Sequence, residues 1–259
     1  MIRALYTSAS GMQAQQMNLD VIANNLANVN TTGFKKSKIE FQDLLYQASR
    51  MAGTEQGAGN QLPAGVEVGH GTRTVSTARQ FTNGEMTQTG GNLDLAVMGD
   101  GMFEVELPDG SRGYTRDGAF KISAAGRVVT SDGYAVTGFP AIPPGVTNVT
   151  IANNGTVTLS TAGGSQSSRL QMARFPNPSG LSSMGRNMYK ETPASGAPET
   201  GQPAENGFGE VNQGYLELSN VKVVEEMVNL IMAQRAYEVN TKAIAAADEM
   251  MQQSNNLKR

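Results

Sequence analysis

The sequence has 259 residues, of which 39% are hydrophobic and 17% charged, with a formal net charge of −3. The charged share is below the roughly 25% usual for globular proteins, and the lack of positive excess argues against a nucleic-acid-binding protein or a polybasic membrane binder. With no cysteine and a single histidine, His70, the chain has no disulfide framework and no site that needs two histidines. No apolar run of about 18 residues and no secretory signal pattern occurs, so neither membrane insertion nor signal-peptide cleavage is expected.

The first segment, residues 1 to about 34, is predicted to form one long helix. Apolar residues recur every seven positions, with companions three residues later, which is typical of a helix that packs against another helix. The predicted seam consists of Leu5, Met12, Leu19, Ile22, Leu26 and Val29. Gly33 suits the left-handed backbone conformation that follows the end of a helix.

The same segment is poor in charge. Between residues 4 and 34 the only charged residue is Asp20, and Gln and Asn replace the Lys, Arg and Glu of an ordinary surface helix. Amides avoid the repulsion and the desolvation cost that charges meet when identical helices crowd together. The pattern favours self-assembly, with a helix buried inside its own subunit as the alternative. Residues 128–168 hold only Asp132, which a Thr- and Ser-rich β region explains, so charge depletion alone does not decide.

The middle of the chain, from about 36 to 212, is predicted to be antiparallel β structure. Asn-Gly and Asp-Gly turn signals recur through it. Between them apolar residues alternate with polar ones, as at Leu93, Leu95 and Val97. Two stretches rich in Gly, Ala and Pro, 51–65 and 192–207, are expected to be loops.

The last segment, 213–259, is again predicted to be helical, with Asn220 as a candidate N-cap. Its predicted apolar stripe consists of Val221, Val224, Val228, Ile231 and Val239. We expect an α+β fold in which the two terminal helices pair as an antiparallel coiled coil and the all-β region is inserted between them. Two unrelated amphipathic helices, each lying on its own core, are the alternative.

Three domains are expected from these changes in composition and hydrophobic periodicity along the chain. Residues 1–35 and 213–259 form a terminal helical coiled-coil domain. Residues 36–80 and 190–212 form a connecting β region with an extended loop at 48–63, and residues 81–189 form an outer β domain.

No catalytic site, metal site or cofactor is predicted. Gly99-Asp100-Gly101 begins like a dinucleotide-binding fingerprint, but Glu104 replaces the third glycine and strands follow instead of a helix. Acidic pairs suited to glycan hydrolysis are also poorly supported. Four of the five candidate aspartates directly precede glycine, where turn formation explains them.

Several separated motifs resemble those of bacterial flagellar rod and hook proteins. Two short central motifs lie at 99–103 and 114–118. The N-terminal motif contains Asn24, Asn25, Leu26, Ala27, Asn28, Thr32, Gly33 and Phe34. The C-terminal motif begins at Gln213 and contains Gln234, Arg235, Ala236 and Tyr237. The motifs occur in the family's order along nearly the whole chain.

The resemblance implies a structural, non-enzymatic subunit of the flagellar basal body. It implies export without a cleaved signal peptide and assembly in the periplasm into a helical homopolymer, a drive shaft that transmits torque from motor to hook and encloses the export channel. The implied partners are proximal rod proteins below, hook-side proteins above, the L- and P-ring proteins around the rod, and the export apparatus.

Within the family, the length and the segment Gln42–Gln47 favour the distal rod over the proximal rod, which is the alternative. The loop from Ala48 to Pro63 that follows is expected to stiffen the rod. From other classes, a module that binds cell-wall glycan and a secreted adhesin are also considered.

Overall fold

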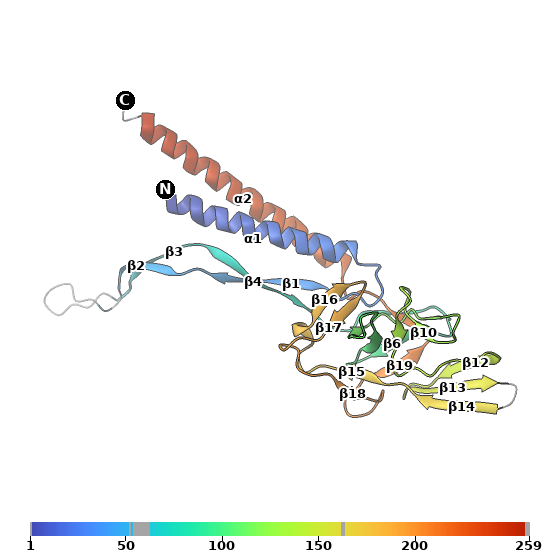
Figure 1. Ribbon diagram of the computed structural model, residues 1–259. Coiled ribbons are helices and arrows are strands. Elements are labelled where there is room, and N and C mark those ends of the chain that lie inside the picture. The colour runs from blue at the N-terminus through green and yellow to red at the C-terminus, as the bar shows by residue number, and fades with distance from the viewer. Residues whose placement is uncertain (1, 52, 54–62, 162–163, 257–259) are drawn as a thin grey trace. The chain divides into compact units, whose positions relative to one another are not determined.

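The computed structural model describes residues 2–51, 53, 63–161 and 164–256 (Figure 1). The described residues divide into two compact units. The helical unit takes them from 1–26, 37–78 and 223–259, and the β unit takes them from 27–36 and 79–222. Strands between residues 37 and 78 therefore group with the terminal helices. The expected division into a connecting region of 36–80 with 190–212 and an outer domain of 81–189 remains a prediction.

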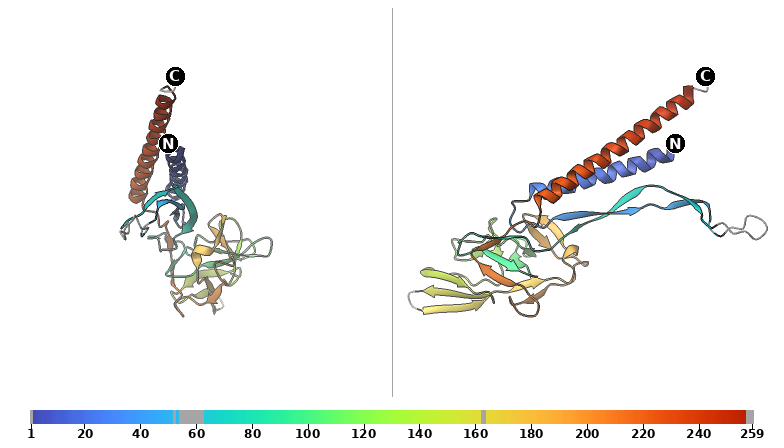
Figure 2. Two further views of the ribbon diagram at one scale, coloured as in Figure 1. Left: turned by 90° about the vertical axis from the view of Figure 1, so that its left-hand side faces the viewer. Right: turned by 180° about the vertical axis from the view of Figure 1, so that it is seen from behind.

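Two long helices, α1 (Ile2–Ala27) and α2 (Val223–Asn256), pack side by side (Figures 1 and 2). Near the middle of α1, the sulfur of Met12 accepts a hydrogen bond from Thr241 Oγ1, near the middle of α2, at 3.5 Å. Near the end of α1, Asn25 contacts Glu226, at the start of α2, at 3.3 Å. The contacts advance in opposite directions along the two helices, so the pair is antiparallel. The predicted pairing is confirmed, whereas the coiled coil stays a prediction.

Both helices are shorter than the sequence predicts. α1 ends at Ala27, ahead of Gly33, which nonetheless has the expected left-handed φ of 67°. Asn220 does not cap α2, which begins at Val223. Its Oδ1 instead accepts a hydrogen bond from the Lys36 backbone N–H at 2.7 Å. Over the residues described, neither helix is apolar for long enough to cross a membrane.

Beside α1 the helical unit carries a narrow β ribbon (Figures 1 and 2). β1 (Ser37–Asp43) pairs with β4 (Thr72–Arg79), and β2 (Tyr46–Arg50) pairs antiparallel with β3 (Val66–Gly69). The expected loop at 48–63 thus begins inside a strand, because the β2 backbone keeps its pairing as far as Arg50. Ala48 and Pro63 are exposed, and residues 52 and 54–62 of this loop lie outside the described residues.

The β unit consists of antiparallel hairpins, as the turn signals predict. Its largest sheet has the order β16-β17-β8-β7-β11-β10-β9, and a second sheet has the order β12-β13-β14. The strands of the largest sheet are β16 (Ser182–Gly185), β17 (Met188–Lys190), β8 (Arg112–Thr115), β7 (Phe103–Glu106), β11 (Ala135–Val136), β10 (Val128–Val129) and β9 (Lys121–Ile122). Those of the second are β12 (Val146–Ile151), β13 (Thr156–Thr161) and β14 (Gly164–Arg169).

Strand pairs complete the β unit. The segment expected to begin the second helix instead supplies two strands that pair with earlier ones. The pairs are β19 (Glu210–Gln213) with β6 (Leu95–Met98), β20 (Tyr215–Glu217) with β5 (Met86–Gln88), and β15 (Met172–Arg174) with β18 (Glu199–Gly201). A short 3₁₀ turn, η1, covers Pro178–Gly180.

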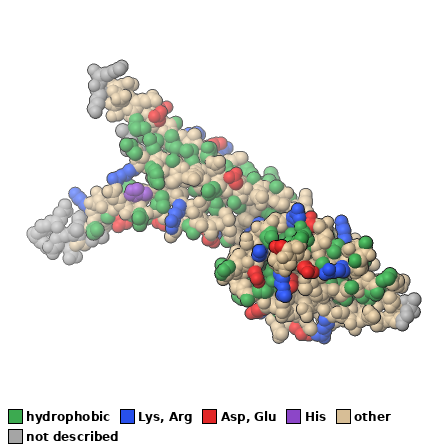
Figure 3. Space-filling view, in the orientation of Figure 1, with side chains coloured by type: hydrophobic (Ala, Val, Ile, Leu, Met, Phe, Trp, Pro, Cys, Tyr) green, Lys and Arg blue, Asp and Glu red, His purple; other side chains and the backbone are tan. Residues whose placement is uncertain are grey.

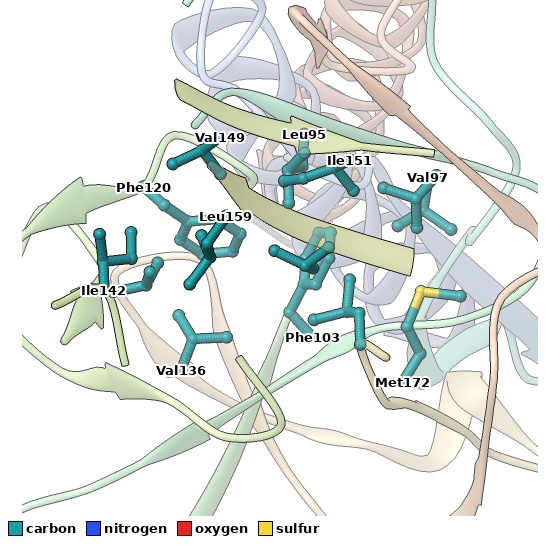
Figure 4. Packing of buried hydrophobic residues seen from close by; sticks show 14 of the residues in the cluster. Leu95, Val97, Phe103, Phe120, Val136, Ile142, Val149, Ile151, Leu159 and Met172 are labelled. Carbon is teal, nitrogen blue, oxygen red and sulfur yellow. The ribbon is translucent and has the colours of Figure 1, made fainter. Parts of the chain in front are cut away.

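The main apolar core lies inside the β unit (Figure 4). Side chains from β6, β7, β12, β13 and β15 converge in it, including Leu95, Val97, Phe103, Leu159 and Met172. The alternation of buried and half-buried residues along β13 is the period expected when one face of a sheet covers a core. Burial of these residues supplies the driving force for folding of the unit.

Candidate assembly surfaces and the buried charge cluster

The residues of α2 that are buried or half-buried in the subunit recur at three- and four-residue spacing, as expected for a helix packed along one side. They are Glu226, Leu230, Ala233, Ala236, Asn240, Ile244, Ala247 and Met251. The two helices come close where α1 carries Gly11, since a Cβ at that position would lie 3.0 Å from Nδ2 of Asn240. Close approach therefore depends on small residues as well as on apolar ones.

The stripe predicted for α2 lies on another face of the helix and is exposed. Val224, Val228, Ile231 and Val239 are 75%, 50%, 55% and 64% exposed. The periodicity marks a second apolar face, while the face that packs in the subunit contains Glu226 and several alanines. Figure 3 shows hydrophobic side chains along the helices. Val221 is a separate case, because it is buried, precedes α2 and belongs to the β unit.

The predicted seam of α1 is more covered than that of α2. Ile22 is 4% exposed, and Leu5, Met12, Leu19 and Leu26 are half-buried. Val29 is half-buried too, but it lies beyond the end of α1 and belongs to the β unit. The β ribbon contacts α1 at other residues, where the backbone N–H of Thr72 donates to Ser10 Oγ at 3.4 Å and Thr74 Oγ1 donates to the sulfur of Met17 at 3.2 Å. α1 is thus flanked by α2 and by the ribbon of its own subunit.

Asn25 connects three elements of the helical unit. Its side chain is 2% exposed, and its Nδ2 donates to the Ser37 carbonyl at 2.9 Å and to Glu226 Oε2 at 3.3 Å. Its Oδ1 accepts from the Ser37 backbone N–H at 2.9 Å. An amide is needed here because one side chain must donate and accept at once. This gives a physical reason for a residue that sequence analysis singled out only by resemblance.

A buried charge cluster lies in the β unit and was not predicted. Lys35 Nζ lies 2.6 Å from Glu217 Oε1, and Arg116 Nε lies 3.0 Å from Glu217 Oε2. The side chains of Lys35, Arg116 and Glu217 are 0%, 3% and 1% exposed. One carboxylate therefore serves two buried cations. Burial and the neighbouring guanidinium lower the pKa of Lys35, while the Glu217 carboxylate acts in the opposite direction.

Backbone carbonyls and the Asn83 side chain accept further hydrogen bonds from the cluster. Arg116 Nη1 donates to the carbonyls of Gly99 and Gly101 at 2.8 and 2.6 Å, and Lys35 Nζ donates to the Thr82 carbonyl at 2.7 Å. These bonds offset part of the cost of removing three charges from water. Arg116 and Glu217 lie within the family motifs, but neither was a predicted site residue. A buried pair 182 positions apart leaves no local spacing signal.

The N-terminal motif meets the cluster through its backbone. The N–H of Gly33 donates to the Glu217 carbonyl at 2.8 Å, and Thr32 Oγ1 donates to Asp117 Oδ1 at 2.9 Å. A Cβ on Gly33 would lie 2.6 Å from the backbone nitrogen of Asp117. Phe34, the next residue, is buried. The geometry therefore joins the motifs around Gly33, Arg116 and Glu217 at one place.

The other motif residues are on or near the helices and are less uniform in exposure. Asn28 Oδ1 accepts from Thr31 Oγ1 at 3.2 Å in the turn after α1. On α2, Arg235 Nη1 lies 3.3 Å from Glu238 Oε2 in an exposed pair. Of the remaining positions, Asn24, Ala27, Gln234 and Tyr237 are exposed and Ala236 is half-buried.

Comparisons with known proteins match the N-terminal, central and C-terminal parts of the chain to flagellar protein families. Residues 5–35 match the model described as "Flagella basal body rod protein", residues 96–159 that of the "Flagellar hook protein FlgE/F/G D1 domain", and residues 212–257 that of the "Flagellar basal body rod FlgEFG protein C-terminal". The flagellar basal-body rod protein FlgG of Borreliella burgdorferi is 47% identical over 100% of both chains. The chain belongs to the FlgG-type family of flagellar basal-body rod proteins.

Further relatives in this family support the same assignment. FlgG of Agrobacterium fabrum is 47% identical over 99% of this chain and all of its own, and FlgG of Bacillus subtilis is 38% identical over the full length of both. Lys35, Arg116 and Glu217 each lie in a different one of the three matched segments. The buried cluster thus ties together the parts of the chain that define the rod family.

Proposed function

We propose that the chain is the structural subunit of the flagellar distal rod, which polymerises helically into the drive shaft between motor and hook and encloses the export channel. The observation that carries the proposal is the second apolar face of α2. Ile231 and Val224 are more than half exposed on a helix whose other face is already packed. A helix that is apolar on two faces needs a partner on each, and in a rod protein that partner is a neighbouring subunit.

The assembly follows from contacts between unlike surfaces. A contact that joins one surface of a subunit to a different surface of the next produces an open filament when the rotation does not close a ring. The predicted seams of α1 and α2 supply apolar packing in that filament, and the helix pair acts there as an antiparallel coiled coil. The amides of α1 allow identical helices to crowd without like-charge repulsion.

The proposed position of the distal rod in the flagellum determines which proteins it contacts. Proximal rod proteins lie below it, hook-side proteins above it, and the L- and P-ring proteins surround it in the periplasm. The subunit reaches this place through the flagellar export apparatus without cleavage of a signal peptide. The proposal assigns it no catalytic activity and no cofactor. Rod proteins are its relatives, and no observation made on the described residues favours a glycan-binding module.

The hairpin of β2 and β3, with the segment 48–63 that joins its strands, is proposed to stiffen the rod by lying between neighbouring subunits. Its strands expose Tyr46, Val66 and Val68, and an isolated two-stranded hairpin is marginally stable in water. Deletion of residues 48–63 should give a more flexible rod in electron micrographs. Unchanged bending stiffness would count against this role.

The central experiment is an electron-microscopy reconstruction of isolated basal bodies that carry a labelled form of this chain. The label is expected along the rod between its proximal part and the hook. A label confined to the proximal end would favour the proximal-rod alternative. Absence of the label from basal bodies, together with retention of the purified chain on cell-wall glycan, would overturn the structural assignment.

A further inference from the structure

The helical unit contains a groove between α1 and the β ribbon. It has a volume of about 460 Å³ and is lined by Met17, Asp20 and Val21 of α1, Ile39 of β1 and residues 74–77 of β4. Its walls are mainly apolar side chains and hydroxyl groups.

Asp20 gives the groove its charge. It is the only charged residue between positions 4 and 34, it is exposed, and it makes no ion pair with any described residue. A carboxylate on the wall of an apolar groove attracts a cation more strongly than the same group in open water, because the low-dielectric walls screen it less. The groove therefore fits an apolar ridge that carries one positive charge.

The exposed face of α2 is such a ridge. At three- and four-residue spacing it presents Val228, Met232, Arg235, Val239, Lys242 and Ala246, all of them exposed. Arg235 pairs with Glu238 within the helix, whereas Lys242 makes no ion pair with any described residue. The cation that α2 leaves without an acidic partner thus lies on its apolar outer face, close to Val239.

Lengths also match. The β4 wall from Thr74 to Thr77 extends about 10 Å at roughly 3.3 Å per residue. The ridge from Arg235 to Lys242 extends about 10 Å at 1.5 Å per residue. Two turns of α2 therefore span the groove.

Within one subunit the two charges cannot meet. Thr241, the neighbour of Lys242, contacts Met12 of α1, and Asp20 lies eight residues further along that helix, about 12 Å away by the helical rise. A pair between Lys242 and Asp20 therefore needs two molecules. Because one chain carries both the groove and the ridge, a second copy of this chain supplies both surfaces of the contact.

We propose that α2 of one subunit lies in the groove between α1 and β4 of the next, with Lys242 of the first paired to Asp20 of the second. This rests on the proposed function as a helical polymer and names one of its contacts. Groove and ridge are different surfaces, so the contact is of the type that propagates without closing. Asp20 sets the axial position at which the neighbouring helix stops.

Charge exchange tests the pairing. Asp20→Lys and Lys242→Asp are each expected to lower the yield of polymer from the purified full chain at least about tenfold, since each places like charges together. The double variant restores the attraction in reverse order and is expected to recover most of the yield. Lys121→Asp, at an exposed lysine of the β unit, is the control and should assemble as the wild type does.

Cross-linking gives a second readout that does not depend on yield. The chain has no cysteine, so the double variant Asp20→Cys and Lys242→Cys introduces the only thiols. Oxidation of its assembled polymer is expected to give covalent oligomers. The control variant, Lys121→Cys with Lys242→Cys, should give no covalent oligomers after the same treatment. Failure of both the rescue and the cross-link, with the wild type still forming polymers, would overturn the groove contact alone. Failure of the wild type to polymerise in vitro and to enter the rod in cells would overturn the proposed function.

Discussion

Lys35 and Glu217 are 182 residues apart in the sequence, yet their side chains form an ion pair of 2.6 Å from which solvent is excluded. The pair links the segment that leaves α1 to the segment that precedes α2. Arg116 joins it from the middle of the chain. The β unit is therefore closed by a contact that needs both ends of its own sequence, and the following predictions test how much this closure and the apolar surfaces contribute.

Glu217→Gln should strongly destabilise the β unit. The substitution removes the one anion that faces Lys35 and Arg116, and breaking a buried pair in this way typically costs about 3–5 kcal/mol. The measurement is the free energy of unfolding in urea, followed by far-UV circular dichroism. Glu210→Gln, at an exposed carboxylate on the neighbouring strand, is the matched control and should change stability little. Equal effects of the two substitutions would contradict a special role for the cluster.

Gly33→Ala should lower the free energy of unfolding more than the same substitution at a left-handed glycine with open space around it. Gly33 has φ of 67° and its Cβ would meet the Asp117 backbone, whereas Gly133 has φ of 88° and open space around it. Gly133→Ala is expected to cost about 1–2 kcal/mol from backbone conformation alone. Gly33→Ala adds a backbone displacement beside the charge cluster. Thermal unfolding of the two variants compares these costs, and a smaller loss for Gly33→Ala would show that the motif segment tolerates displacement.

Tyr114→Phe should leave the protein at least as stable at neutral pH and more resistant to alkali. The Tyr114 hydroxyl is buried and lacks a hydrogen-bond partner among the described residues, so its removal relieves a desolvation cost. Burial raises the pKa of Tyr114 to about 12. The unfolded chain, with a tyrosine pKa near 10, loses the proton first, so this group costs stability as pH rises from about 10 to about 12.

The measurement for Tyr114→Phe is the midpoint of urea unfolding at pH 7 and at several values above pH 9. The difference between variant and wild type should widen in the variant's favour above pH 10. Tyr215→Phe at pH 7, at a tyrosine that is 36% exposed, controls for loss of a phenol hydroxyl in general. A constant difference across the whole pH range would show that Tyr114 ionises as readily in the folded protein as in the unfolded chain.

Ile231→Glu should abolish assembly without unfolding the subunit. Ile231 is 55% exposed on the outer face of α2, and a charge there would have to be desolvated in a contact between subunits. Ile122→Glu is a close match, because Ile122 is 52% exposed on a strand of the β unit. Swimming motility and rod length in electron micrographs are the readouts. Normal rods with Ile231→Glu would place the assembly contact elsewhere.

Local patterns predicted much of the architecture. A seven-residue repeat predicted the first helix, three- and four-residue spacing predicted the second, and turn signals with period-two alternation predicted the antiparallel strands between them. Helix boundaries were less accurate. Asn220 looked like an N-cap, but its amide bonds to Lys36 and Gln80 in the β unit. The loop predicted to begin at Ala48 in fact begins inside strand β2, because a composition that favours turns does not show that β2 pairs with β3.

Patterns along the chain were enough to predict the main elements, the family and the unusual lack of charge in α1, since these depend on residues near one another in sequence. The face of α2 that packs against α1 could be identified only from the folded chain. α2 is apolar on more than one side, and periodicity identifies a stripe without saying what covers it. The structure turned Val224, Val228, Ile231 and Val239 outward and brought Lys35, Arg116 and Glu217 together. Such long-range contacts follow from how strands and turns close in space, which no local spacing records.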